Sequence, residues 1–105
     1  MSSQLTRLFA SLNRAQPIAI LAMPQCPFCV RATQLLQQRG IAFKYIDATT
    51  DPDGIAAFRE VESRFNHDTY PAILCGPQRF IGGFSDLSAL DQRGELQAAV
   101  QAAPE

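Results

Sequence analysis

The part of the sequence that most restricts the fold is an apolar run followed at once by a cysteine pair. The run is Ile18–Ala22, and the motif Cys-Pro-Phe-Cys comes four residues later, from Cys26 to Cys29. An unbroken apolar run of this length is typical of a strand covered on both faces. Pro27 suits the first position of a helix. The two cysteines are therefore predicted to lie where a buried strand gives way to a helix.

The segments on either side of this junction have the spacing of helices. Four apolar residues near the N-terminus recur with the period of a single helix face: Leu5, Leu8, Phe9 and Leu12. A short amphipathic helix is expected there, and Pro17 is expected to stop it. Residues 27–39 are predicted to form a second helix, which Gly40 ends.

The second half of the chain continues the alternation of strands and helices. A strand is predicted over 42–47, and a helix follows to about Phe65 with Asp51 as its N-cap. Two short strands are expected over 72–75 and 79–81, close enough to form an antiparallel hairpin. Ser85 is expected to cap a last helix, which should be interrupted at Gly94.

This order of elements predicts an α/β fold, with a mixed sheet of four strands flanked by helices on both faces and an added N-terminal helix. No internal repeat or low-complexity linker divides the sequence. A length of 105 residues fits one domain over 1–105.

Composition and charge exclude several classes of protein. The formal net charge is −1, so no basic field for nucleic acid is expected. The longest apolar run is far shorter than the roughly 20 residues of a membrane-spanning helix. Three cysteines are an odd number and too few to staple a small secreted domain. We therefore expect reduced thiols, no membrane association and a cytoplasmic location.

The cysteine pair has the spacing of a redox centre. A thiolate is the reactive form of cysteine, and the N-terminus of a helix stabilises it. Cys26 is expected at that position, as the attacking thiol. Cys29, one turn further along, is expected to be more buried and to resolve a mixed disulfide held on Cys26.

Three other interpretations of the pair are open. A structural zinc site needs four ligands, and only Cys75 and His67 remain to complete one. A structural disulfide would close so short a loop that it restricts the unfolded chain little. A cysteine protease would use His67 as a base but has no role for a second thiol. Redox chemistry uses both cysteines, and no bound metal is expected.

Three motifs together resemble the glutaredoxin family of the thioredoxin-fold superfamily. "CPFC" at Cys26 to Cys29 is similar to the CPYC of that family, "TYP" at Thr69 to Pro71 is similar to TVP, and "IGGFSDL" from Ile81 is similar to IGGxxDL. The resemblance covers nearly the whole chain. It implies a thioredoxin fold and an enzyme that uses glutathione as its co-substrate.

The resemblance also implies a glutathione site beside the cysteines. In the family the proline of TVP is cis, which places a cis bond at Pro71, and the backbone before it pairs with the cysteinyl part of glutathione. Amides at the start of the last helix hold the γ-glutamyl end, with the aspartate of GGxxD near its amino group. The expected glutathione-binding residues are Phe28, Thr69, Tyr70, Pro71, Gly83, Phe84, Ser85 and Asp86.

Four positions depart from the family pattern or are not explained by it. Met23 stands where many members carry a lysine that supports the thiolate and the ligand. His67 stands where Gln or Arg is frequent, and Asp68 beside it would oppose a ligand carboxylate. Weaker or more pH-dependent glutathione binding is therefore expected. Cys75 is expected to be a small buried apolar residue, with oxidative regulation as the alternative.

The function implied by the resemblance is the reduction of protein disulfides and glutathionylated proteins by a monomer. Glutathione supplies the electrons, and the glutathione reductase system regenerates it. Two alternatives remain at this point. An iron–sulfur cluster could be held between two subunits, although Pro27 stiffens the loop, and a thioredoxin-like donor would not need the GGFSD segment.

Overall fold

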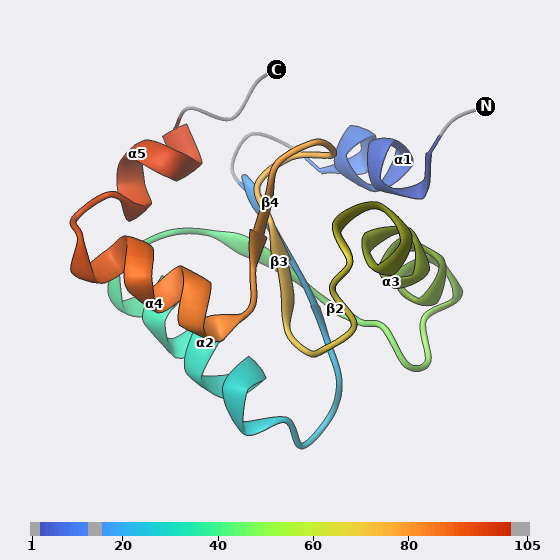
Figure 1. Cartoon of the computed structure of the whole chain (residues 1–105), viewed down its shortest axis with the longest axis horizontal. Coiled ribbons are helices and arrows are strands. Elements are labelled where there is room, and N and C mark those ends of the chain that lie inside the picture. Colours follow the sequence, from blue (N-terminus) through green and yellow to red (C-terminus); the bar gives the residue numbers. More distant parts are fainter. Residues whose placement is uncertain (1–2, 13–15, 102–105) are drawn as a thin grey trace.

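A four-stranded mixed sheet forms the centre of the computed structural model, which describes residues 3–12 and 16–101 (Figure 1). The strand order is β2-β1-β3-β4. β1 (Ile18–Ala22) is parallel to β2 (Phe43–Asp47) and antiparallel to β3 (Ala72–Leu74). β3 pairs in turn with the antiparallel β4 (Phe80–Gly82). All five residues of β1 are buried, which confirms the strand expected from the apolar run.

Helices cover both faces of this sheet (Figure 1). α2 (Pro27–Gln38), α4 (Phe84–Gln92) and α5 (Leu96–Gln101) lie on one face, and α1 (Gln4–Ser11) and α3 (Pro52–Phe65) lie on the other. The predicted α/β architecture is therefore confirmed, including the added N-terminal helix. None of these helices is long and apolar enough to cross a bilayer.

The core is divided by the sheet into two apolar clusters. Alternate side chains of a strand point to opposite faces, so β1 contributes to both. Ile18 and Ile20 pack under α2 with Cys29, whereas Ala19 and Leu21 pack under α1 and α3. The central strand thus ties the two layers of helices together.

α1 contributes apolar side chains to the cluster that lies under α1 and α3. Leu5 is fully buried, and its backbone N–H donates to Glu60 Oε1 on α3 at 3.2 Å. Leu8, Phe9 and Leu12 pack against the same cluster, as the predicted stripe requires. The helix ends at Ser11, before the predicted stop at Pro17.

The last helix begins earlier than predicted. Ser85 is not its N-cap, because α4 already starts at Phe84 and Gly83 is the capping residue. Asp86 replaces the expected serine cap, since its Oδ2 accepts the Gly83 N–H at 3.0 Å. The predicted interruption at Gly94 is confirmed, because that residue has a φ of 71° and separates α4 from α5.

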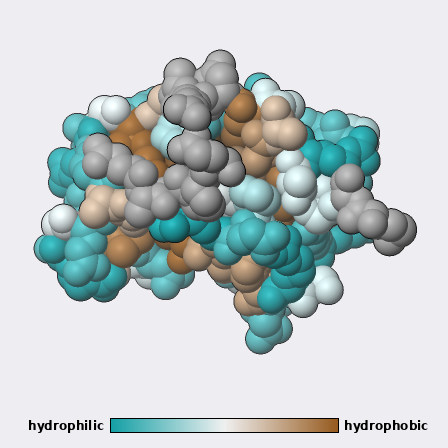
Figure 2. All heavy atoms as spheres, turned by 90° about the horizontal axis from the view of Figure 1, so that it is seen from above, coloured by the Kyte–Doolittle hydropathy of each residue, from teal (hydrophilic) through white to brown (hydrophobic). Residues whose placement is uncertain are grey.

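The junction of β1 and α2, which holds the cysteine motif, and α1 lie at opposite ends of the molecule. β1 leads into α2 at the bottom of Figure 1, and α1 lies near the top. Figure 2 shows the upper end, where hydrophilic surface separates several small apolar areas.

Candidate active site

Cys26 occupies the N-cap of α2, as predicted. Its side chain is 5% exposed, and its Sγ accepts a hydrogen bond from the Cys29 backbone N–H at 3.2 Å. Gln25 just before it has a φ of 62°, which turns the chain out of the sheet and into the helix. Unpaired amides and the positive end of the helix dipole favour negative charge at this position. The local geometry therefore stabilises an anionic sulfur on Cys26.

Cys29 has the opposite surroundings. It is 1% exposed, and burial raises the pKa of its thiol from 9.0 to about 12. The hydrogen bond with Cys26 and the negative charge of Cys26 act in the same direction, whereas the Met23 backbone lowers the pKa. Cys29 therefore keeps its proton at neutral pH. Cys29 is also the more buried of the two thiols, as the sequence predicts.

The loop before β3 brings a carbonyl group to the reactive sulfur. The Tyr70–Pro71 peptide bond is cis, as the family resemblance implies. Cys26 Sγ lies 3.9 Å from the Tyr70 carbonyl oxygen, to which the protonated thiol donates. The Tyr70 ring turns away and stacks on Phe58 of α3, with centroids 4.4 Å apart. The backbone of Tyr70 is thus left to face the cysteine.

His67 braces this loop from within. Its Nε2 lies 3.2 Å from the Pro71 carbonyl oxygen and 3.3 Å from Thr69 Oγ1, and its ring meets Phe80 edge-on at 4.9 Å. The supporting rings of Phe58 and Phe80 were missed by the sequence analysis. No local signal marks either one, because both are apolar residues in ordinary helix or strand positions.

Three segments surround Cys26: the start of α2, the cis-proline loop before β3, and the turn from β4 into α4, which forms the third wall of the site. Gly82 has a φ of 126°, and a Cβ at this position would collide with the Asp86 carboxylate. At the start of α4, the amides of Phe84 and Ser85 have no partner within the helix. Phe84 also approaches Phe28 of the cysteine motif, with ring centroids 6.2 Å apart.

Contacts connect the predicted site residues into one group. Cys26 touches the Tyr70 carbonyl, and Phe28 meets Phe84. A Cβ built on Gly83 would lie 3.6 Å from the Pro71 oxygen, so the turn and the cis-proline loop are neighbours. Thr69 joins the group through its contact with His67. Ser85 and Asp86 join it because they lie in the first turn of α4.

Cys75 lies apart from this group. It is 4% exposed, and its Sγ lies near the carbonyl oxygens of Arg79 and Ala99, at 3.7 and 3.9 Å. Its burial agrees with the expected apolar role. Within the described part of the chain, no three His, Cys, Asp or Glu side chains gather in an arrangement that could hold a metal ion.

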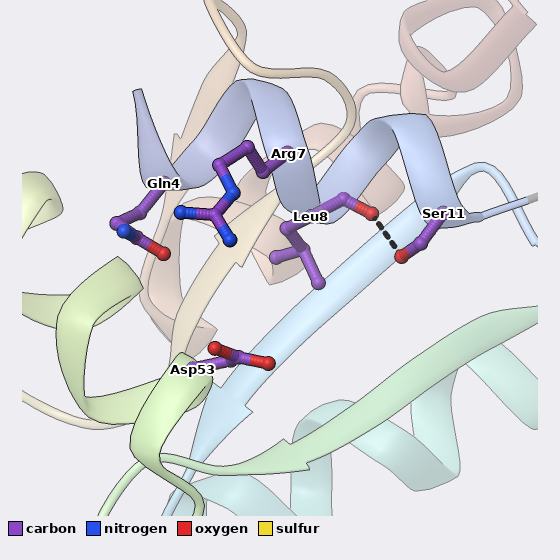
Figure 3. A pocket seen from close by; sticks show the side chains of 5 residues that line it. All are labelled: Gln4, Arg7, Leu8, Ser11 and Asp53. Atoms are coloured by element: carbon purple, nitrogen blue, oxygen red, sulfur yellow. Dashed lines mark hydrogen bonds between the residues drawn. The ribbon is translucent and has the colours of Figure 1, made fainter. Parts of the chain in front are cut away.

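A small hollow lies on the opposite face of the sheet from α2 (Figure 3). Gln4, Arg7 and Leu8 extend from α1 toward Asp53 in the first turn of α3, and Ser11 completes the lining. Ser11 donates to the Leu8 carbonyl at 2.7 Å. No thiol lines this hollow, so it is separate from the cysteine site.

Comparison with known proteins agrees with the geometry. The glutaredoxin family model matches residues 18–81, which include both cysteines and the cis-proline. The chain belongs to the glutaredoxin family. A glutaredoxin of Pseudomonas aeruginosa is 36% identical over 86 residues, spanning 82% of this chain and 98% of that protein. The resemblance drawn from the three motifs is thereby confirmed, and with it the class of thiol–disulfide oxidoreductase.

Solved structures extend the agreement to the fold of this glutaredoxin. A dithiolic glutaredoxin of Trypanosoma brucei brucei matches with a TM-score of 0.76 and 30% identity, over 95% of this chain and 97% of that one. A buckwheat glutaredoxin in complex with glutathione matches with a TM-score of 0.76 over 93% and 91% of the two chains. Its identity is 22%, so this second likeness bears on the fold alone. The predicted thioredoxin fold is confirmed.

Proposed function

We propose that this glutaredoxin uses glutathione to reduce protein disulfides and glutathionylated proteins, acting as a cytoplasmic monomer. The observation that carries the proposal is the contrast between its two thiols. Cys26 has a sulfur that accepts a helix amide, and Cys29 has a pKa raised to about 12 by burial. An attacking sulfur at a helix N-terminus beside a protonated thiol is the arrangement that two-step thiol–disulfide exchange uses.

The first reaction removes glutathione from a protein. The Cys26 thiolate attacks the glutathione sulfur of the mixed disulfide, and the protein sulfur leaves as a thiolate and takes a proton. A second glutathione thiolate then attacks the sulfur bound to Cys26. This step releases glutathione disulfide and restores the Cys26 thiolate, so each cycle consumes one free glutathione, and the glutathione removed from the protein forms the other half of the disulfide. The glutathione reductase system would return the product to its reduced form.

The second reaction reduces a protein disulfide and requires both cysteines. Cys26 attacks one sulfur and the other leaves as a thiol. Cys29 then loses its proton and attacks Cys26, which frees the second protein thiol and forms the Cys26–Cys29 disulfide. The short separation in α2 supports this step, since the Cys29 amide already contacts the Cys26 sulfur. Two glutathione molecules reduce the resulting disulfide.

We assign the glutathione site to the three walls around Cys26. The Tyr70 backbone next to Pro71 would pair with the cysteinyl part, and the amides of Phe84 and Ser85 at the start of α4 would bind the γ-glutamyl carboxylate. Asp86 would lie near the free amino group while it holds the Gly83 amide. Membership of the glutaredoxin family supports glutathione as the ligand of this site. The complete assignment is Phe28, Thr69, Tyr70, Pro71, Gly83, Phe84, Ser85 and Asp86.

A glutathione-dependent hydroxyethyl disulfide assay on three forms of the protein tests this function. The wild type and Cys29→Ser should reduce the mixed disulfide formed with glutathione, and Cys26→Ser should not. With a protein disulfide as substrate, only the wild type should be active. Activity of Cys26→Ser on either substrate, or loss of both activities in Cys29→Ser, would contradict the assigned roles.

A further inference from the structure

Exposed apolar side chains gather around the cysteine motif. Over the described ranges, four large apolar residues have more than a third of their surface exposed: Met23 at 36%, Phe28 at 52%, Val30 at 51% and Tyr45 at 46%. Met23, Phe28 and Val30 lie within four residues of Cys26 along the chain. We call these four residues the apolar rim.

Tyr45 belongs to the rim through the fold and not through the sequence. It lies on β2, on the same side as Phe43, which packs into the cluster under α2. Tyr45 pairs with Ile20 of β1, which belongs to the same apolar cluster as Cys26 and Cys29. Burial raises the pKa of its phenol. The strand face and this pairing therefore place Tyr45 on the side of the sheet that holds both cysteines.

A concentration of apolar surface at one place indicates a contact with another molecule. Single exposed apolar residues are normal, whereas a group of them marks an interaction site. Phe28 serves the proposed glutathione site, but Val30 and Tyr45 are not among the residues assigned to glutathione. The part of the rim that they form is therefore left for the other half of a mixed disulfide, which is the protein.

The charge at the border of the rim is positive. The Arg31 guanidinium lies over the Phe28 ring, 5.4 Å from its centroid. Among the described residues, no carboxylate forms a salt bridge with Arg31. The Asp47 carboxylate near Tyr45 is turned to its own loop, since Oδ1 accepts the Thr49 N–H at 2.8 Å. Arginine paired with an aromatic ring is a frequent anchor of protein interfaces.

We propose that the apolar rim binds the polypeptide around the substrate cysteine, and that Arg31 selects a nearby carboxylate. The preferred substrate is a glutathionylated segment with apolar residues next to its cysteine and an acidic residue beyond them. Cys26 is 5% exposed, so a substrate sulfur that reaches it brings its neighbouring side chains close to the rim. This inference rests on the proposed function and adds the chemistry of the protein substrate.

Glutathionylated peptides of matched length test the proposal. One carries serine on both sides of the cysteine, a second carries leucine, and a third carries leucine with a glutamate beyond. The wild type should reduce the leucine peptide with a kcat/KM about tenfold above that of the serine peptide, the range that one or two buried apolar contacts provide. The glutamate should add about threefold, as expected for a solvent-exposed ion pair.

Variants assign these preferences to the rim. Val30→Ser and Tyr45→Ser should each reduce the preference for leucine to about threefold or less, since an exposed apolar contact is removed. Arg31→Met should remove only the gain from glutamate. Gln37→Ser, on an exposed part of α2 away from the motif, is the matched control and should change neither preference. All four variants should keep wild-type activity on the mixed disulfide of glutathione and mercaptoethanol.

The outcomes distinguish a failure of the proposed docking surface from a failure of the proposed enzyme function. Equal rates for the serine and leucine peptides in the wild type would overturn the docking surface while leaving the enzyme active on the small substrate. Unchanged preferences in both Val30→Ser and Tyr45→Ser would also overturn it. Inactivity of the wild type toward every substrate would overturn the proposed function itself.

Discussion

The two faces of the sheet make different contributions to this protein. The face under α2 and α4 carries both motif cysteines, and the apolar rim lies at its border. The face under α1 and α3 carries apolar packing, with Leu5 and Val61 fully buried. Tyr70 packs against both clusters and presents its carbonyl to Cys26. Reactivity therefore depends on groups at the end of one layer, and the other layer holds that end in place.

Substitution of the attacking sulfur should separate chemistry from stability most completely. Cys26→Ser removes the nucleophile and leaves its volume nearly unchanged, so activity should fall by at least about three orders of magnitude, as for other covalent nucleophiles. The urea midpoint should stay close to that of the wild type. Activity is measured with glutathione and hydroxyethyl disulfide. A large loss of stability would mean that the reactive end also carries the fold.

Truncation on the other face should have the reverse effect. Leu5 is fully buried between α1 and α3, so Leu5→Ala should lower the free energy of unfolding by about 3 kcal/mol. The folded variant should keep its kcat, because no group near Cys26 is moved. Urea denaturation gives the stability, and assays well below the transition give the activity. Ala10→Ser on an exposed position of α1 is the control and should change neither.

Substitution of Gly82 should change both the stability of the fold and the KM for glutathione. Gly82→Ala forces a side chain into a φ of 126° and against the Asp86 carboxylate. Stability should fall by about 2 kcal/mol from backbone strain. The KM for glutathione should rise, since the Asp86 to Gly83 hydrogen bond orients the amides of α4. Gly94→Ala is the comparison, because it also has a positive φ but open space around it. It should lose stability with an unchanged KM.

The smallest effect concerns the pH dependence of stability from Cys29. Folding raises the pKa of this thiol from 9.0 to about 12, so the folded state holds a proton that the unfolded chain releases. The free energy of unfolding should therefore be unaffected below about pH 9 and fall as the pH rises further. Tyr45 and Tyr70, whose pKa values are also raised, act in the same direction.

Comparison with Cys29→Ala isolates this contribution. Urea denaturation between about pH 8 and pH 10.5 should show a shallower decline in the variant than in the wild type. Equal slopes would indicate that the Cys29 thiol is not held protonated by its surroundings. The assigned difference between the two cysteines would then lose its main support.

Local patterns predicted most of the elements in this chain. Pro27 at the start of α2 and Asp51 at the N-cap of α3 act only on residues within one helical turn. The structure contains both of these helix starts. The start of α4 was predicted wrongly at Ser85 because two signals competed. Serine is a favoured cap, but Gly82 turns the chain earlier and Asp86 takes the amide of Gly83. A cap depends on the direction from which the chain arrives, and that direction is set by β4.

The sequence by itself determined the redox pair, its place at a strand-to-helix junction and the family. These three features depend on residues that are close together in the sequence, and the spacing of those residues already specifies the local backbone structure. Only the tertiary structure decided that the Tyr70 carbonyl meets Cys26, that Phe84 meets Phe28, and that His67 braces the cis-proline loop. Those contacts join segments far apart in the chain. They arise because the sheet order brings the ends of three strands to one place, which no local pattern encodes.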